Sequence, residues 1–189
     1  MVKTRIIAVI DLILKVRKEI LSGETLAYND ALALTGLSVL ETPYLAAVAN
    51  EVRQKFVGDK FEACALSNIK SGNCSEDCKF CAQSGHYRTD SPVFPQINVD
   101  EIVSQAKAAE AIGATEFCLV SSGWGATHEK EFETVLEAVR QIAAQTKLLV
   151  DCSLGFLTPE QAQALKKAGV YRNNHNLESS KNYFEKVCT

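Results

Sequence analysis

The sequence predicts an α/β fold in which part of a parallel (β/α) barrel follows an N-terminal helical segment. Two observations carry this prediction. Residues 58–189 alternate between short apolar runs and amphipathic stretches of helical period, a pattern typical of parallel sheets. Residues 1–57 show helical patterns alone. We therefore divide the chain into an N-terminal helical segment, 1–57, and a barrel segment, 58–189.

The first predicted helix has one broad apolar face and ends at Gly23. A second helical stretch spans 28–34, and a third runs from about Pro43 to Phe56, with its proline in the first turn, where no backbone N–H is needed. Asp11 interrupts the first apolar run, so we interpret it as an amphipathic helix and not as a signal peptide. Its apolar face comprises Ile6, Ile7, Val9, Ile10, Ile13, Leu14 and Val16.

Four short apolar runs in the second segment are predicted to be strands. Because helical stretches separate them, the sheet is predicted to be parallel. The second run ends in the small residues Ser121, Ser122 and Gly123. Small or polar residues follow the strand ends, which is where parallel α/β folds place their active sites. The predicted strands are 61–68, 115–123, 147–155 and 170–176.

The helices between these strands have recognisable ends. Asp100 is predicted to cap the first one, which stops at Gly113. Thr158 and Gln161 predict a capping box for the helix that stops at Gly169. The remaining predicted helices are 128–146 and one that begins within 179–187.

The second segment is too short for a closed barrel. A TIM-type barrel of eight strands takes roughly 250 residues, whereas the pattern here supplies about four strand–helix units. We therefore expect the front half of a larger barrel, truncated or split. An exposed sheet edge is normally avoided, so we also expect a partner to cover the open side.

The composition is that of an ordinary globular protein. Of 189 residues, 47% are hydrophobic and 23% charged, and the net charge is −3, so no nucleic-acid partner is expected. No apolar run approaches the roughly 18 residues of a membrane span. Seven cysteines without a signal peptide indicate reduced thiols used for metal or redox chemistry. The expected location is the cytoplasm, or the mitochondrial matrix in a eukaryotic cell.

Three cysteines stand close together in the stretch SGNCSEDCKFCAQS, residues 71–84. Cys74, Cys78 and Cys81 form a CxxxCxxC pattern. Thiolates select zinc, copper(I) or iron–sulfur clusters, and structural zinc requires four closed ligands. A four-iron cluster held by three cysteines leaves one iron open to a small molecule. The pattern thus favours a reactive [4Fe–4S] cluster, with a redox pair or a zinc half-site as the alternatives.

At this triplet the sequence resembles the radical S-adenosylmethionine (radical SAM) enzymes. Two longer stretches, ALSNIKSGNCSEDCKFCAQSGHY and VDCSLGFLTPEQAQALKKAGVYRNNHNLESS, resemble one family among them, the biotin synthases. The resemblance implies a radical SAM sulfurtransferase that inserts sulfur into dethiobiotin to give biotin. It also implies that the open iron binds S-adenosylmethionine, which one electron cleaves to give a 5′-deoxyadenosyl radical.

The resemblance assigns roles to individual residues near the triplet. Phe80 matches an aromatic position that packs near the adenine of the cofactor. Asn176 and Glu178 match cofactor contacts, and Glu178 stands where the family usually has an aspartate. Asn174 and Asn176 match substrate contacts.

The biotin synthases also hold a [2Fe–2S] cluster through three cysteines and an arginine. Cys118 and Cys152 match two of these cysteines, and we expect both to point into one barrel interior. The third cysteine and the arginine belong to later strands, which this sequence lacks. A buried core cysteine is the alternative for each. Cys64 is expected to be a core residue, and Cys188 matches no ligand position.

The resemblance further implies dethiobiotin as substrate, an electron donor such as flavodoxin, and a homodimer for a full-length protein. No nucleic-acid or membrane partner is expected. Two other functions remain open. One is a different radical SAM enzyme with a related barrel, and the other is a non-catalytic remnant that binds metal through the triplet.

Overall fold

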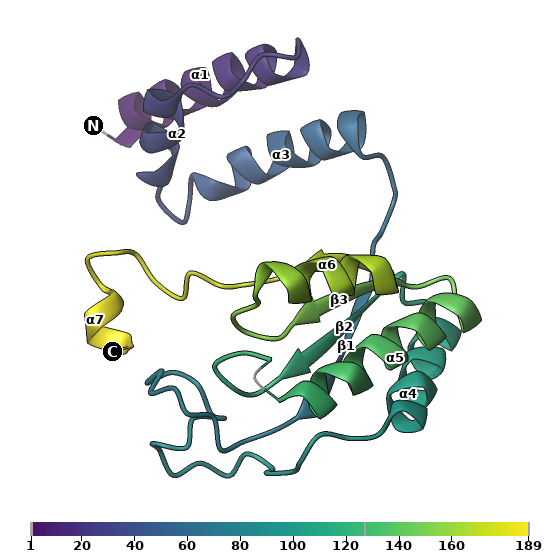
Figure 1. Ribbon diagram of the computed structural model, residues 1–189. Helices are drawn as coiled ribbons and strands as arrows, with labels where there is room; N and C mark the ends of the chain where they lie inside the picture. Colours follow the sequence, from purple (N-terminus) through teal and green to yellow (C-terminus); the bar gives the residue numbers. More distant parts are fainter. Residues whose placement is uncertain (1, 127, 189) are drawn as a thin grey trace. The chain divides into compact units, whose positions relative to one another are not determined.

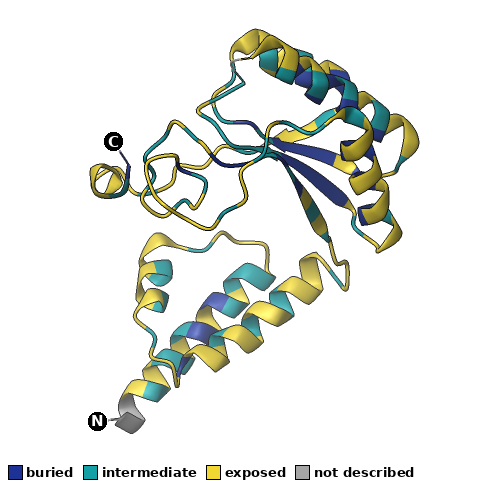
Figure 2. Ribbon diagram, turned by 90° about the horizontal axis from the view of Figure 1, so that it is seen from below, coloured by how far each residue is buried: buried dark blue, intermediate teal, exposed yellow. Residues whose placement is uncertain are grey.

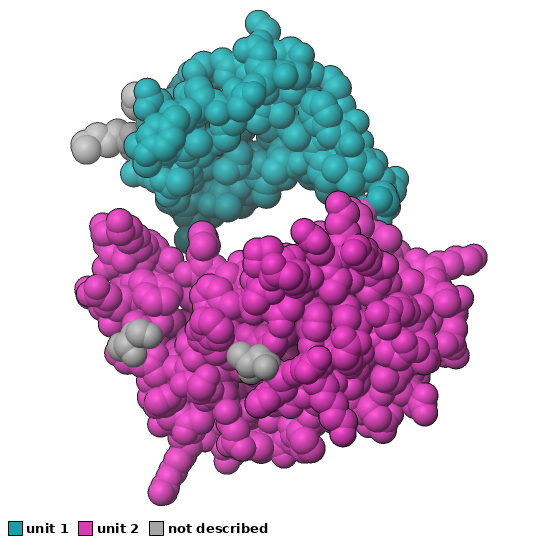
Figure 3. Space-filling view, in the orientation of Figure 1, with its two compact units in different colours: residues 1–61 teal, residues 62–189 magenta. Residues whose placement is uncertain are grey.

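The computed structural model describes residues 2–126 and 128–188. The chain divides into two compact units, residues 1–61 and 62–189 (Figure 3). None of the helices in these described stretches combines the length and the apolar character that a membrane span requires.

The first unit consists of α1 (Val2–Leu21), α2 (Tyr28–Thr35) and α3 (Thr42–Phe56). The α1 helix packs against α3 and buries Ile13 and Val16 almost completely. The buried face of α1 is narrower than predicted, since the side chains of two residues on the predicted face, Ile7 and Leu14, are 52% and 51% exposed.

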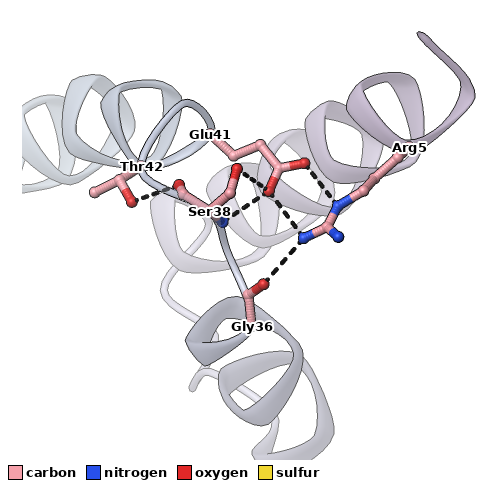
Figure 4. A network of polar contacts seen from close by, with 5 residues as sticks. All are labelled: Arg5, Gly36, Ser38, Glu41 and Thr42. Carbon is pink, nitrogen blue, oxygen red and sulfur yellow. Dashed lines mark hydrogen bonds and ion pairs between the residues drawn. The ribbon is translucent and has the colours of Figure 1, made fainter. Parts of the chain in front are cut away.

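A polar network joins the start of α1 to the start of α3 (Figure 4). The carboxylate of Glu41 receives the Arg5 Nε–H at 3.1 Å, the Ser38 backbone N–H at 2.8 Å and the Ser38 hydroxyl at 2.7 Å. These hydrogen bonds lower the pKa of Glu41 to about 2, and the bonds from Ser38 have the largest effect. The network therefore holds a buried negative charge that ties the two helices together.

The second unit is built on a parallel sheet whose strands follow one another in chain order. Its strands are β1 (Cys64–Lys70), β2 (Glu116–Ser121), β3 (Leu149–Ser153) and β4 (Val170–Asn173). A doubly wound sheet reverses its strand order at one point, whereas a (β/α) barrel does not. The order β1-β2-β3-β4 therefore confirms the predicted fold class, a partial α/β barrel.

Three helices, α4 (Val99–Ala111), α5 (Glu129–Gln145) and α6 (Pro159–Ala168), cover one face of this sheet (Figure 1). Right-handed crossovers between neighbouring parallel strands place every helix on the same side. The central strands β2 and β3 are largely buried (Figure 2), and the sheet's core residues Ile69, Phe117 and Val150 pack with residues of these helices. The core between the two layers includes Ile69, Ile102, Phe117, Leu119, Val139, Ile142 and Val150.

One detail of the predicted helices needs correction. The α4 helix is capped by Asn98, whose side-chain oxygen accepts the Glu101 N–H at 2.9 Å, and not by Asp100, which lies inside its first turn. Helix α7 (Phe184–Val187) begins within the predicted range 179–187. The capping box of Thr158 and Gln161 is confirmed.

The first strand also differs from its prediction. The strand runs from residue 64 to residue 70, two to three residues later than predicted, and the Leu66 side chain is 68% exposed. Cys64, expected in the core, is exposed as well. Side chains along a strand alternate between the two faces of the sheet. Ile69 points toward the helices, so Cys64 and Leu66 lie on the opposite face.

Candidate functional site

The cysteine triplet lines a cavity of about 330 Å³ at the carboxyl ends of the strands. Cys74, Cys78 and Cys81 lie on the loop that follows β1. The opposite wall comes from the ends of β2 and β3 and from the segment after β4. It includes Ser122, Gly123, Ser153, Phe156, Asn176 and Glu178.

The base of the cysteine loop is tied to the end of the neighbouring strand. The Ser122 hydroxyl donates to the Gly72 carbonyl at 3.0 Å, and the Ser122 N–H donates to the Lys70 carbonyl at 3.1 Å. Gly72 has a φ of 76°, and a Cβ there would lie 2.6 Å from Cγ2 of Val93. Only glycine suits this turn, which starts the loop.

Polar residues just after the triplet hold the loop in shape. The Ser84 hydroxyl donates to the Glu76 carbonyl at 2.5 Å, and Thr89 bonds the Ala82 carbonyl at 2.6 Å. We predicted no role for these residues from the sequence. A dense run of hydrogen-bonding side chains directly after a cysteine motif could have indicated that they hold the loop. His86 and Tyr87 act in the same way, on the Ser75 and Asp77 carbonyls.

The donor set fits a multi-iron cluster better than a single ion. A single ion requires ligand atoms that lie close together. Among the described residues, three ligand atoms within 4.8 Å of one another are found at Cys64, Glu116 and Asp151, but not at the triplet. The triplet's sulfurs are spaced more widely than that, as would suit thiols that hold a multi-iron cluster and not one ion. Three soft thiol donors around one cavity fit such a cluster.

Glu178 places a carboxylate in the cavity from a left-handed backbone, with a φ of 60°. This conformation is unfavourable for residues other than glycine and is concentrated at functional sites. Asn176 lines the same cavity. Phe80 is placed differently: its side chain is 56% exposed and is not part of the cavity wall, so its proposed adenine contact stays a prediction.

An aromatic row borders the cavity. Phe156 stands between Trp124 and His175, with ring centroids 4.9 Å and 4.6 Å away. The loops carrying Trp124 and Phe156 touch through their backbones, because a Cβ on Gly155 would lie only 2.3 Å from the Trp124 carbonyl oxygen. Sequence reasoning found no role for Phe156, since this row forms only when β2, β3 and β4 are assembled.

Cys118 lies on the sheet face away from the helices. Burial, and next the negative charge of Asp151, raise the pKa of its thiol. Asp151 pairs with Cys118 in the β2–β3 register. Arg172 bonds Asp151 at 2.6 Å and Glu116 at 2.7 Å, so a guanidinium already engages both carboxylates. Asn174 follows β4 and is not among the residues that line the triplet's cavity.

Cys152 does not share that face. It pairs with Leu119, and both belong to the hydrophobic core beneath the helices. The expectation that Cys118 and Cys152 point into one interior therefore fails, because a one-residue offset between neighbouring strands reverses the face. As placed, the two cysteines do not fit a shared [2Fe–2S] cluster. Burial raises the pKa of the Cys152 thiol to about 12, as suits a core residue.

A fourth thiol, Cys188, lies in the triplet's cavity. The pKa of Cys78 is raised to about 12. Burial is the largest cause, and the interaction with the Cys188 thiol is the second. Sequence reasoning left Cys188 without a role, because 110 positions separate the two cysteines and neither spacing nor pattern links them.

The four parallel strands follow the order of a (β/α) barrel, and the cysteine triplet lies at their carboxyl ends. Together these two features indicate the class of enzymes that use an iron–sulfur cluster with one iron left unligated by the protein. The family model described as the radical SAM superfamily matches residues 68–189. The chain therefore belongs to the radical SAM superfamily. Membership implies a [4Fe–4S] cluster and S-adenosylmethionine, and the triplet's cavity is where the chain offers the ligands for them.

Curated relatives narrow the comparison. The chain is 49% identical over 178 residues to the biotin synthase of Cyanothece sp. (strain PCC 7425 / ATCC 29141), covering 91% of this chain and 48% of that protein. It is 42% identical over 172 residues to the biotin synthase of Pelotomaculum thermopropionicum, covering 91% and 53%. The chain thus spans about half the length of the curated relatives that it matches.

Solved structures agree on the fold. The FeFe-hydrogenase maturase HydG from Carboxydothermus hydrogenoformans superposes with a TM-score of 0.71, covering 98% of this chain and 44% of that one, at 18% identity. A second HydG structure gives a TM-score of 0.65 at 12% identity, covering 85% of this chain and 36% of that one. At these identities the likeness concerns the fold alone.

Proposed function

We propose that this chain is the cluster-binding part of a biotin synthase, which inserts sulfur into dethiobiotin to give biotin. The observation that supports it best is identity of 42–49% to biotin synthases over 91% of the chain. The triplet, Asn176 and Glu178 line one cavity, and all of them fall within residues 68–189, which the radical SAM family model matches.

The chain's own residues suit the handling of S-adenosylmethionine. When bound, the cluster supplies the electron that cleaves the sulfonium of this cofactor. Cys74, Cys78 and Cys81 would hold the cluster. Glu178 would accept hydrogen bonds from the ribose hydroxyls of the cofactor, and the small residue Gly123 lets its methionine part approach the backbone. The aromatic row beside the cavity would keep water from reactive species.

Anaerobic reconstitution with iron and sulfide tests the cluster. We expect about four irons per chain through the triplet, and methionine with 5′-deoxyadenosine when S-adenosylmethionine and a strong reductant are added. Cys78→Ala should lose both iron and products, whereas Cys64→Ala, a change of an exposed thiol outside the cavity, should keep them. Tight binding of one zinc without iron–sulfur absorption would instead support a non-catalytic remnant.

Labelled substrate separates a biotin synthase from another radical SAM enzyme. Dethiobiotin carrying deuterium at the carbons that receive sulfur should transfer deuterium to 5′-deoxyadenosine. The measurement is mass spectrometry of the nucleoside. Cleavage of S-adenosylmethionine that neither responds to dethiobiotin nor carries its label would favour the other enzyme and contradict the proposed substrate.

We also propose that Cys118 and Cys152 are the residues to test for a second, two-iron cluster, on the family resemblance alone. Of these two cysteines, Cys118 lies on the sheet face away from the helices and Cys152 lies in the core beneath them. Cys118→Ser should therefore remove any iron bound beyond four per chain, whereas Cys152→Ser should mainly weaken the core. Loss of that iron in both variants would mean that β3 pairs with β2 in a register shifted by one residue when the iron is bound. Such a shift would turn Cys152 away from the helices and Asp151 toward the core.

The remaining proposals rest on the resemblance. They are an electron donor such as flavodoxin, a homodimer for the full-length protein, and a cytoplasmic location. Sedimentation of the chain at several concentrations tests the dimer, and reduction of the loaded cluster by flavodoxin tests the donor.

A further inference from the structure

One wall of the triplet's cavity is formed by residues 174–188, which run from the end of β4 through α7 and which we call the wall segment. Most of its residues are exposed. Because the segment buries little apolar surface, its position depends on specific contacts with the rest of the second unit. The residues that it contributes to the cavity are His175, Asn176, Glu178, Phe184 and Cys188.

At its start the wall segment is attached to the sheet. The Asn174 N–H donates to the Cys152 carbonyl at 2.7 Å, directly after the pairing of β3 with β4. The next residue, His175, packs its ring against Phe156, with the ring centroids 4.6 Å apart. These contacts fix the beginning of the segment, and they lie before Glu178 in the chain.

The far end of the wall segment is attached to the cysteine loop through Lys79. The Lys79 backbone N–H donates to the Val187 carbonyl at 2.9 Å, and its ammonium donates to the Lys186 carbonyl at 2.7 Å. The last carbonyls of a helix have no partner within the helix, and a lysine side chain is well suited to bond them. Lys79 thus bridges the loop that offers the iron ligands and the helix that closes the cavity.

Short-range hydrogen bonds make α7 and the turn before it one body. The Phe184 N–H donates to the Ser180 carbonyl at 2.9 Å, and the Cys188 N–H donates to the Phe184 carbonyl at 2.8 Å. Glu178 precedes this body and has a left-handed backbone, with a φ of 60°. Such a conformation persists only where the surrounding structure holds it. The sheet holds the chain before Glu178, and Lys79 holds the chain after it.

We propose that Lys79 is a positioning residue of the cofactor site, which holds α7 against the cysteine loop and thereby keeps Glu178 in the cavity wall. The inference rests on the proposed function, in which Glu178 binds the ribose of S-adenosylmethionine. The role differs from that of the neighbouring Cys78 and Cys81, because the Lys79 ammonium only donates hydrogen bonds and offers no ligand to iron.

The first test uses the full chain without iron. Lys79→Met removes the ammonium, Lys79→Arg keeps a cationic donor, and Lys107→Met changes an exposed lysine on α4 as the control. The backbone bond of residue 79 remains in every variant, so the comparison isolates the side chain. Circular dichroism verifies the fold, and mass spectrometry follows hydrogen exchange in peptides from residues 177–188. We expect several-fold faster exchange there in Lys79→Met, nearly wild-type exchange in Lys79→Arg, and no change in Lys107→Met.

The second test uses the protein after anaerobic reconstitution. Lys79→Met should hold as much iron as wild type and bind S-adenosylmethionine several-fold more weakly, as measured by the change in the cluster's spectrum. The double variant Lys79→Met/Glu178→Gln should bind the cofactor no more weakly than Glu178→Gln alone, because both residues act through one contact. A role of Lys79 in the general stability of the fold would instead add its own loss to that of Glu178→Gln.

The outcomes separate the two proposals. Wild-type exchange in Lys79→Met, or faster exchange with unchanged affinity, would overturn the role of Lys79 and leave the proposed function intact. Additive losses in the double variant, or loss of iron in Lys79→Met, would also overturn it, since Lys79 would then act on the fold or on the cluster itself. A wild-type chain that forms no four-iron cluster would contradict the proposed function, whereas the exchange measured without iron would still decide whether Lys79 holds the wall segment.

Discussion

At the scale of single residues, the candidate site depends on backbone conformations that most side chains avoid. Gly72, Gly123 and Gly155 all have positive φ angles around the cavity, and so does Glu178, which has a side chain. Gly155 also makes a close backbone contact, whereas Gly113, at the end of α4, has open space around it. This contrast lets steric contact be tested separately from backbone strain.

Gly155→Ala should destabilise the protein more than Gly113→Ala. Both alanines would adopt a left-handed backbone, at a cost of about 1 kcal/mol. At residue 155 the new Cβ would also meet the Trp124 carbonyl oxygen, 2.3 Å away. Such overpacking adds about 1–3 kcal/mol. Urea denaturation measures the two free energies of unfolding, and equal values would contradict the close contact.

Glu178→Gln should weaken the binding of S-adenosylmethionine to the loaded chain by roughly ten-fold or more, because a charge-assisted hydrogen bond is replaced by a neutral one. The substitution keeps the side-chain length and changes only the charge. Equilibrium binding of the cofactor, followed by the change in the cluster's spectrum, provides the measurement. Glu185→Gln on the exposed α7 is the matched control. Equal affinities in both variants would remove Glu178 from the cofactor site.

At the scale of elements, helix ends follow from the sequence more closely than strand faces do. Thr158, Pro159 and Gln161 specify the start of α6 through local bonds alone. The face occupied by Cys152 depends instead on the register between β2 and β3, which the sequence of either strand does not contain. Asn98 and Asp100 are both residue types that cap helices, and in the structure it is Asn98 that caps α4.

The triplet shows a similar division. Its spacing predicted one site with three thiols, and the resemblance named Asn176 and Glu178 as cofactor contacts. The structure places all of these residues around one cavity. Phe156 and Cys188 escaped prediction because they reach the cavity only through tertiary contacts with distant loops. Sequence thus identifies the reactive groups, whereas the surroundings that tune them require the fold.

Thr158→Ala should destabilise the second unit by about 1 kcal/mol, the usual loss when an N-cap side chain is removed. The Thr158 hydroxyl accepts the Gln161 N–H at 3.2 Å, and Gln161 bonds back to the Thr158 N–H at 2.9 Å. Thermal and urea unfolding supply the measurement. Thr134→Ala, a change of a half-buried threonine inside α5 and away from any helix cap, should cost less, and an equal loss there would contradict the capping role.

The Glu41 network makes the helical unit sensitive to acid. The pKa of Glu41 is about 2 in the folded unit, below its ordinary value of 4.5. The charged form therefore favours folding above pH 4.5, and this contribution disappears as the pH falls from 4.5 to 2. Glu41→Gln should be less stable than wild type at neutral pH, and the difference should shrink in acid.

Hydrogen exchange of peptides from residues 2–56, compared between wild type and variant at each pH, measures this difference. The exposed Glu129→Gln serves as the control, and its difference from wild type in these peptides should stay near zero throughout. A Glu41→Gln deficit that persists unchanged at pH 2 would show that the network acts through shape and not through charge.

At the scale of the whole molecule, the division into two compact units predicts where the chain is cut. The segment between α3 and β1 contains Phe61, whose side chain is 83% exposed. Limited digestion with chymotrypsin should cleave first after Phe61, because exposed connecting segments are the preferred sites of proteolysis. Mass spectrometry identifies the fragments. First cuts within β1–β4 would contradict a division at this segment.

The strand order β1-β2-β3-β4 has a consequence for the growing chain on the ribosome. Each strand pairs with the one made just before it, so the sheet can widen as synthesis proceeds. Roughly a hundred residues lie between Cys81 and Cys188, and at about 5–20 residues per second their translation takes on the order of ten seconds. For much of that interval the three thiols lack the walls that later surround them, so a cluster inserted before residue 188 is made would be open to solvent on those sides.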